Sequence, residues 1–320
     1  MTRAEALACF RMDCCRKQEV LHQMLIQRMP EKMTELMEGI YASLERIAEQ
    51  AQERGKTDRM YFLFGLQRYD LKKNRATVQL DVTGMACYLE EDPLTTQLDI
   101  TFLFQDYFDW QEKLYQEIKK YQGKVQREDV EALVQEEIMA GNRLLPGILR
   151  LAFRNLEEQT CFQQIDKLPF FLIRWGEWRE ESEIVLRVDR SRRKPEVWQE
   201  KLAKYQKDSG ILEAGHWYQM HLSGGDCQRK QMYFTTFEDC VLEGIDFSQA
   251  GLWGARFLRC QLRGCNFTGA DLRQAEFADC QWEENQFLSA DLEQAVFSEE
   301  GFPLEAFEES QLKVLFVSSP

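Results

Sequence analysis

Residues 235–298 have the sequence TTFEDCVLEGIDFSQAGLWGARFLRCQLRGCNFTGADLRQAEFADCQWEENQFLSADLEQAVFS. A bulky apolar residue occupies every fifth position here, thirteen times in succession: Phe237, Leu242, Phe247, Leu252, Phe257, Leu262, Phe267, Leu272, Phe277, Trp282, Phe287, Leu292 and Phe297. A small residue such as Ala250 stands two positions before most of these centres, with Ile245 and Asn285 as exceptions. A period of five fits neither the 3.6-residue repeat of a helix nor the two-residue repeat of a strand. We therefore predict a repeat architecture, with these thirteen residues as its core.

The repeat resembles the pentapeptide-repeat family, whose motif is A(D/N)LxX. Clean copies are Cys265-Asn266-Phe267, Ala270-Asp271-Leu272 and Ala290-Asp291-Leu292. The resemblance covers about residues 235–298, a minority of the 320-residue chain. It implies a right-handed quadrilateral β-helix with four pentapeptides in each coil.

Aligned at a period of 20, like residues stack on like, as a solenoid core requires. One column is Phe237, Phe257, Phe277 and Phe297, and another is Cys240, Cys260 and Cys280. The cysteine column is open to a metal or redox interpretation. However, neighbouring coils should lie about 4.8 Å apart, which exceeds the Cβ separation of about 3.8 Å in a disulfide. Because cysteine also behaves as a small buried hydrophobe, we favour packing.

We expect the regular coils to span residues 231–302, because the small position fails near residue 300 and Pro303 follows. Residues 303–320 are expected to form a short C-terminal helix with Phe307, Leu312 and Leu315 on its apolar side. This helix would cap the last coil, since open coil ends expose unpaired strand edges. The alternative is a homodimer contact through the C-terminus, which occurs in relatives with longer solenoids.

The preceding residues, 1–210, are predicted to form a mainly helical α+β domain with a small antiparallel sheet. Apolar periodicity predicts two helices in residues 3–53, broken near Pro30 and ended by Gly55. A β-hairpin is expected near residues 60–90, because MYFLFGL at 60–66 is followed by the alternating run TVQLDVT at 77–83. Further elements are a strand at 183–189 and helices at 98–122, 128–139, 145–164 and 195–206. The glycine-containing residues 211–230 are interpreted as a junction, after which the first coil would abut the N-terminal domain.

No catalytic, cofactor-binding or metal-binding residues are predicted. The chain has no phosphate-loop, dinucleotide-binding, HExxH or GxSxG motif. Three weaker candidates remain. His216 and His221 stand near Cys227 and could form a Cys/His pair with it. Carboxylate doublets such as Glu90-Glu91 are interpreted as surface charges. The aromatic residues between Phe102 and Trp110 fit a hydrophobic core better than a ligand cavity.

Charge and composition narrow the class of partner. The net charge is −14, and residues 235–300 contribute −9 from 13 acidic residues and 4 arginines. This balance disfavours nucleic acid and anionic membrane surfaces as partners. No stretch approaches the roughly 18 apolar residues of a membrane span. The ten cysteines form no CxxC pair, so we expect reduced thiols and a cytoplasmic protein.

The leading functional hypothesis is a non-catalytic interaction or scaffold protein, whose helical domain binds another protein and whose acidic solenoid gives a rigid second surface. It predicts an exposed apolar patch on the N-terminal domain. The resemblance implies an alternative, a DNA mimic that modulates a type II topoisomerase. That role would require ranked acidic side chains, and 3.2 coils would measure only roughly 15 Å. A third alternative is an enzyme, which predicts a pocket containing His22, His216 or a buried carboxylate.

Overall fold

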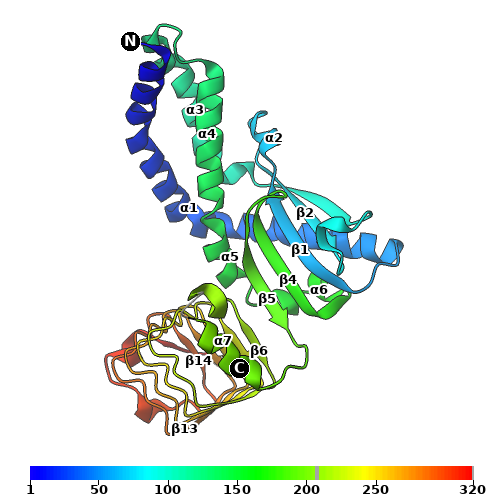
Figure 1. Ribbon diagram of the computed structural model, residues 1–320, viewed down its shortest axis with the longest axis vertical. Coiled ribbons are helices and arrows are strands. Elements are labelled where there is room, and N and C mark those ends of the chain that lie inside the picture. Colours follow the sequence, from blue (N-terminus) through cyan, green and yellow to red (C-terminus); the bar gives the residue numbers. More distant parts are fainter. Residues whose placement is uncertain (206–208, 319–320) are drawn as a thin grey trace. The chain divides into compact units, whose positions relative to one another are not determined.

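The computed structural model describes residues 1–205 and 209–318 (Figure 1). The chain divides into two compact units, residues 1–186 and residues 187–320. The division falls within strand β5 (Ser182–Asp189). Helix α7 (Glu196–Lys204), expected to end the first domain, therefore belongs to the second unit.

The first unit begins with α1 (Arg3–Glu53), a single helix of 51 residues. A reciprocal capping box between Thr2 and Glu5 starts it, and Gly55, at φ 59°, follows its end. The prediction of two helices broken at Pro30 is wrong. Proline removes one backbone hydrogen bond and bends a helix, but packing on both sides can hold the helix together. Met29 and Leu36 are both buried, and Figure 1 shows α1 changing direction along its length.

Two further helices, α3 (Gln105–Glu117) and α4 (Arg127–Asn142), lie alongside the N-terminal half of α1. The ring of Phe10 on α1 meets Tyr121 edge-on at 6.0 Å. The expected helix at 98–122 starts later, at Gln105, because its first residues end strand β3 (Leu94–Asp99). Of the aromatic residues from Phe102 to Trp110, Phe102 is half-buried and the others are core residues, as favoured above.

A five-stranded mixed sheet forms the rest of the unit, in the order β3-β2-β1-β4-β5. Strands β1 (Arg59–Leu66) and β2 (Thr77–Thr83) form the predicted hairpin, with the four-residue helix α2 (Arg68–Leu71) in its connection. The expectation of a purely antiparallel sheet is wrong, because β1 pairs in parallel with β4 (Lys167–Glu177). The register of that pair shifts near Pro169, the kind of irregularity where a strand tolerates proline.

Helices cover one face of this sheet. The predicted helix at 145–164 is three short segments instead: α5 (Leu145–Ala152), a 3₁₀ turn (Leu156–Glu158) and α6 (Thr160–Gln163). The breaks let Phe153 and Phe162 both turn inward, where their rings lie 6.4 Å from Phe64 and 5.2 Å from Phe62. The C-terminal half of α1 covers the β3 edge, where Gln50 hydrogen-bonds to the backbone of Thr95 in both directions. This edge is thereby protected from pairing with other chains.

The second unit is a four-sided β-solenoid of about five turns. One side stacks six parallel strands: β6 (His216–Tyr218), β8 (Thr236–Glu238), β10 (Arg256–Leu258), β12 (Glu276–Ala278), β14 (Val296–Ser298) and β15 (Phe316–Ser318). A second side stacks four: β7 (His221–Ser223), β9 (Val241–Glu243), β11 (Gln261–Arg263) and β13 (Gln281–Glu283). On each of the other two sides, isolated parallel bridges connect successive coils. Asp246 pairs with Asn266 on one of these sides, and Gly251 pairs with Asp271 on the other. Every pairing joins residues 20 apart.

The interior contains the predicted columns. Rings of Phe257 and Phe277 stack at 4.6 Å, and those of Phe247 and Phe267 at 5.0 Å. Twelve of the thirteen residues in the five-residue series are at most 1% exposed, whereas Trp282 is half-buried. Asn285, an exception at the small position, accepts a hydrogen bond from the Cys265 N–H and donates one to the Leu262 carbonyl. Its polar side chain thereby fits a buried position.

The coil begins earlier and ends later than expected. Left-handed φ values recur at every fifth residue from Ala214 to Gln294, so residues 211–230 are no junction but contain most of the first coil. Trp198 of α7 covers this coil, with its ring 4.8 Å from that of Trp217 and edge-on to it. Gly225, at φ 146°, gives Trp198 room, because a Cβ there would lie 3.0 Å from the indole nitrogen. The cap of the first coil is thus part of the second unit.

Residues 303–318, the part of the tail that the structure describes, form no α-helix, contrary to expectation. It contains two 3₁₀ turns (Leu304–Ala306 and Gln311–Lys313) before β15 pairs with β14. Its apolar residues keep the five-residue period through Phe302, Phe307, Leu312 and Val317, which is why a helix does not form. Phe307 extends the phenylalanine column at 4.8 Å from Phe287, Leu312 packs against the same core, and Leu315 is buried. These residues pack within the last coil.

Replacing Trp198 by alanine should uncap the solenoid. We expect a loss of about 3–5 kcal/mol in unfolding free energy, typical of removing a buried aromatic ring, and faster aggregation because a strand edge becomes exposed. Chemical denaturation and light scattering measure both effects. Trp198→Phe, which keeps a ring, should lose less than half as much, and equal losses for the two variants would contradict the capping role.

Candidate functional site

The face of the sheet that the helices leave uncovered is the candidate site of the first unit. Alternation along β1 and β4 places Tyr61, Leu63, Leu172 and Arg174 on this face, while Phe62 and Phe64 point to the core. Tyr61 pairs in register with Leu172, and Leu63 pairs with Arg174. These side chains form a patch with three apolar members and one guanidinium group.

A pocket of about 600 Å³ lies over this patch. Its volume is in the range of ligand-binding clefts, about 300–1,000 Å³. Besides the four sheet residues, the lining includes Cys87, Tyr88, Arg143, Pro146, Trp175, Gly176, Glu180, Glu181, Ser182 and Glu183. Arg174 donates to the Ser182 hydroxyl and to its carbonyl, so its guanidinium group is already engaged. The arrangement is an apolar floor with a polar rim.

Four large apolar side chains are exposed near this pocket: Tyr88 lines it, Met85 and Leu89 belong to the same loop as Tyr88, and Trp178 lines a small adjoining hollow with Leu63, Tyr88 and Arg174. Met85 is 79% exposed, Tyr88 53%, Leu89 86% and Trp178 36%. Three of them lie in the loop between β2 and β3, and Trp178 lies in the turn between β4 and β5. We call these four residues and the pocket the apolar face. It matches the exposed apolar patch that the interaction hypothesis predicts for this unit.

The Met85–Leu89 loop is held in place by Glu90. The Glu90 carboxylate accepts hydrogen bonds from the Gly84 N–H at 2.6 Å and from Arg59 at 2.8 Å. Burial opposes ionisation of Glu90, but the Gly84 N–H and Arg59 outweigh it and keep the pKa of this carboxyl below its usual range. Glu90 is therefore not the surface charge that its position in a doublet suggested. It fixes the loop so that Tyr88 and Leu89 are presented outward.

A pair of glycines positions the other side of the apolar face. Gly65 and Gly176 are neighbours in the β1–β4 register. A Cβ at Gly65 would lie 2.6 Å from the Trp178 Cα, and one at Gly176 would lie 2.2 Å from the Glu181 carbonyl. Both contacts involve backbone, so any larger residue would displace the turn. The glycines let the turn fold closely over the end of the sheet.

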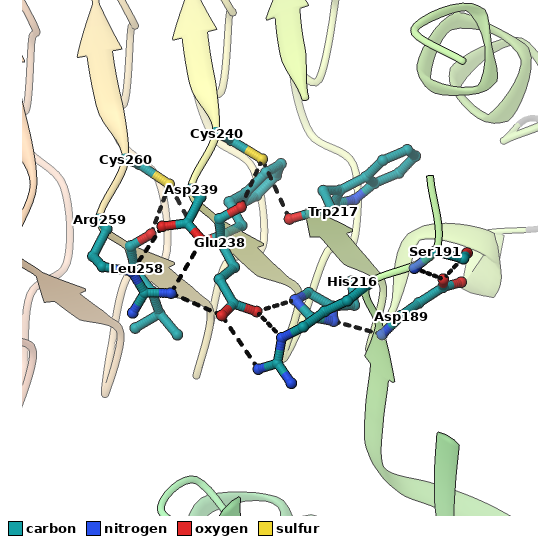
Figure 2. Close-up of polar contacts among 12 residues, drawn as sticks. Asp189, Ser191, His216, Trp217, Glu238, Asp239, Cys240, Leu258, Arg259 and Cys260 are labelled. Carbon is teal, nitrogen blue, oxygen red and sulfur yellow. Dashed lines mark hydrogen bonds and ion pairs between the residues drawn. The ribbon is translucent and has the colours of Figure 1, made fainter. Parts of the chain in front are cut away.

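The second unit contains a dense polar cluster on the outer side of its first coils (Figure 2). His216, only 2% exposed, accepts a hydrogen bond at Nδ1 from the Asp189 N–H, and its Nε2 lies 3.0 Å from the Glu238 carboxylate. Arg190 and Arg259 also contact Glu238, at 3.0 and 2.8 Å. Burial opposes ionisation of Glu238, but His216 and Arg190 overcome it and lower its pKa to about 2.

This cluster is not arranged as a catalytic triad. In a triad, the histidine has one nitrogen on a carboxylate and the other on a nucleophile. Here both nitrogens of His216 are engaged by the Asp189 backbone and Glu238, and the Ser191 hydroxyl donates to Asp189 instead. The cluster joins the segment around residue 190 to the solenoid side. It is a structural ion-pair network.

The other sequence candidates are not brought together for catalysis. Cys227 is buried in the solenoid core, whereas His221 is exposed and lies 3.0 Å from Glu243. His22 lies 3.4 Å from Glu137 in the first unit, and burial raises the pKa of that carboxyl. Neither His22 nor Glu137 lines the pocket of the apolar face. The enzyme hypothesis predicts a pocket that contains His22, His216 or a buried carboxylate, and the pocket of the apolar face contains none of these groups.

The cysteine column takes part in packing. Each thiol donates to a backbone carbonyl of the preceding coil: Cys240 to Trp217, Cys260 to Phe237 and Cys280 to Phe257, at 3.3, 3.3 and 3.2 Å. Burial raises the pKa of the Cys260 thiol far above its usual range, which keeps it protonated. Within residues 1–205 and 209–318, no group of three or more His, Cys, Asp or Glu side chains is arranged to hold a metal ion. The same residues include no helix with the length and apolar character of a membrane span.

Residues 211–287 match the family model of the pentapeptide repeat region. The C-terminal part of the chain is thus a pentapeptide-repeat solenoid, and the N-terminal part has no match. No curated protein matches the chain.

Among solved structures, one similar chain is the pentapeptide repeat protein Rfr23 of the cyanobacterium Cyanothece, with 15% identity over 31% of this chain and 99% of that one, at a TM-score of 0.22. A pentapeptide repeat protein of the Arabidopsis thaliana thylakoid lumen is 19% identical. The match covers 33% of this chain and 80% of that one, at a TM-score of 0.16. QnrB1, a plasmid-mediated fluoroquinolone resistance protein, is 19% identical. The match covers 28% of this chain and 72% of that one, at a TM-score of 0.13.

Sequence reasoning missed the apolar face. Tyr88, Leu89 and Trp178 are ordinary residues of loops in the sequence, and their exposure depends on how two distant turns fold over one sheet. The one local signal was MACYL at residues 85–89, an apolar run directly after a strand. The hairpin expected near residues 60–90 includes this run.

Glu238→Gln should destabilise the second unit by about 3 kcal/mol, because it leaves His216 and two arginines without their shared carboxylate. The pKa of Glu238 is lowered from 4.5 to about 2 in the folded state. Its contribution to stability is therefore complete above pH 4.5 and is lost as the pH falls toward 2. Urea denaturation at pH 7 and pH 3 should show a smaller loss on acidification for the variant than for the native chain.

The matched control is Glu243→Gln on the neighbouring strand. Glu243 and its partner His221 are both more than half exposed, so the change should cost less than about 1 kcal/mol. Equal effects of the two substitutions at pH 7 would contradict the assigned network.

Proposed function

We propose that this chain is a non-catalytic interaction protein, in which the apolar face of the N-terminal unit binds a protein partner and the solenoid gives a rigid second surface. The supporting observation is the exposure of Tyr88, which lines a pocket with an apolar floor, and of Met85, Leu89 and Trp178, which lie next to it in the same loop or line the adjoining hollow. Aromatic residues and methionine are enriched at protein interfaces. An aromatic or aliphatic side chain of the partner would fill the pocket, as anchor residues do in other complexes.

The way this face is built supports the same proposal. Glu90 and the glycine pair fix both sides of the pocket before any partner arrives, which lowers the ordering cost of binding. The ten cysteines are all free thiols, which fits a reducing compartment, and the proposal places the protein in the cytoplasm.

The charge distribution weakens the alternative of a topoisomerase-modulating DNA mimic. All four arginines of residues 235–300 contact carboxylates: Arg256 with Glu276, Arg259 with Asp239, Arg263 with Glu283 and Arg273 with Asp271. Three of the four sides therefore carry arginines among their carboxylates rather than ranked acidic residues alone. About five turns measure roughly 24 Å, longer than expected from the sequence but still short of one DNA turn of about 34 Å.

The decisive variant for the protein-binding proposal is Tyr88→Glu, which puts a charge at the rim of the pocket. Affinity capture from the native host's lysate should retain a protein with the native chain and lose it with this variant, because an unpaired carboxylate opposes burial. Mass spectrometry identifies the retained proteins. Tyr69→Glu is the matched control, since Tyr69 is 67% exposed and does not line the pocket. Identical capture by all three chains would contradict the proposal.

A homodimer through the C-terminus is a second candidate, favoured by the end of the solenoid. Strand β15 is the last strand of its sheet, and it exposes Phe316 at 59% and Val317 at 46%. An exposed apolar edge strand is a ready template for pairing with another chain. We expect sedimentation equilibrium at micromolar concentration to give the dimer mass for the native chain and the monomer mass for Phe316→Asp. A native chain that is monomeric throughout this range would exclude the dimer.

A further inference from the structure

One side of the solenoid gathers three aromatic residues on its outer surface. Positions that follow an inward residue point away from the core, and on the second side they are occupied by Ser223, Glu243, Arg263 and Glu283. The side centred on Met232, Leu252, Leu272 and Leu292 instead presents Tyr233, Phe234 and Trp253. All three aromatic residues are partly exposed although their neighbours in the core are buried.

Two of these side chains lie against each other, and the third lies against the backbone of the next coil. The rings of Phe234 and Trp253 are 4.9 Å apart. Tyr233 lies over Gly251 of the next coil, where a Cβ would be only 2.5 Å from its ring. Because coil stacking and a glycine hold them, the rings form a fixed platform rather than mobile surface side chains.

An amide ladder continues from the platform toward the end of the solenoid. The Trp253 indole N–H donates to the Gln274 side-chain oxygen at 3.2 Å, and Gln274 donates in turn to Gln294 at 2.9 Å. Trp253, Arg273, Gln274, Glu293 and Gln294 line a hollow of about 380 Å³. The hollow thus combines an indole with amide, guanidinium and carboxylate groups.

The charges of the hollow select against an anionic ligand. Arg273 donates to both carboxylate oxygens of Asp271, at 2.9 and 2.8 Å, and lies 3.6 Å from Asp291. Its guanidinium group is therefore already neutralised, while Glu293 adds a negative charge. A phosphate or a nucleic acid would meet more carboxylate than free cation. The lining residues themselves are balanced, with one cation and one anion.

We propose that this hollow binds a neutral oligosaccharide. A sugar ring has an apolar face of C–H groups and an edge of hydroxyls. The apolar face would lie on the partly exposed Trp253 indole, as other apolar groups do on aromatic rings. The hydroxyls would pair with the Gln274 and Gln294 amides and the Glu293 carboxylate, which supply both donors and acceptors. Successive sugars would follow the ladder from coil to coil. This inference is independent of the apolar face of the first unit.

The test is titration of the full chain with three neutral probes, cellohexaose, maltohexaose and the hexamer of N-acetylglucosamine, by calorimetry and ligand-observed NMR. Polygalacturonate is the anionic comparison. At least one neutral probe should bind with a Kd between about 10 μM and 5 mM, more tightly than polygalacturonate. Trp253→Ala should weaken binding at least tenfold and Gln294→Ala about threefold. Tyr69→Ala, which removes an exposed aromatic ring of the other unit outside the apolar face, should leave the Kd unchanged.

Fold is monitored by denaturation of each variant, and Gln294→Ala, at an exposed position, keeps the test valid if Trp253→Ala unfolds the coil. The proposal is overturned if none of the three neutral probes binds at 10 mM (a limit of about 3 kcal/mol in affinity). It is also overturned if polygalacturonate binds more tightly than all of them. A Kd unaffected in Gln294→Ala and in a folded Trp253→Ala would overturn it as well.

Discussion

The structure of the second unit depends on a single backbone constraint, a turn through left-handed φ at every fifth residue. This conformation recurs without interruption from Ala214 to Gln294, mostly at residues other than glycine. Each such residue costs about 1–2 kcal/mol relative to the right-handed region. The cost is offset because each corner turns a new pair of side chains into the core and aligns the strands 20 residues apart. Everything on the outer surface, including the charged network and the aromatic platform, takes its position from these corners.

This constraint also explains which part of the fold was predictable. A five-residue period can be recognised wherever a bulky apolar centre follows a small residue by two positions. The core residues of the coils from Phe237 to Phe297 could therefore be predicted individually. The first coil was missed because Met220 and Lys230 occupy its small positions and Cys227 occupies a centre. In the structure, Trp198 and its helix close that end of the core, so less regular residues are accommodated there. The tail was misjudged for a similar reason, since its glutamates broke the small position while Phe302 and Phe307 kept the period.

The N-terminal unit shows a different limit. Its helices and its β1–β2 hairpin follow from local periodicity, but β4 joins the sheet beside β1 across about 100 residues of intervening chain. No local pattern reports such a parallel pairing, and Pro169 inside β4 argues against a strand at all. The apolar face depends on that pairing, because Leu63 and Leu172 become neighbours only through it. The sequence supported the hypothesis of a binding surface on this unit. Its location depends on the register of the β1–β4 pair, which only the structure gives.

Net charge is a poor guide to function in this protein, and the structure shows why. The solenoid sequence is strongly acidic, yet Glu238 lies between a histidine and two arginines, and Asp271 is held by Arg273. Such pairs use much of the formal charge to connect one coil to the next or to the segment that precedes the solenoid. What distinguishes one side of the solenoid from another is therefore the residue type at its outward positions rather than the sum of its charges. The side that presents Tyr233, Phe234 and Trp253 differs in this way from the second side, whose outward positions hold Ser223, Glu243, Arg263 and Glu283, and binding is the simplest physical explanation of the difference.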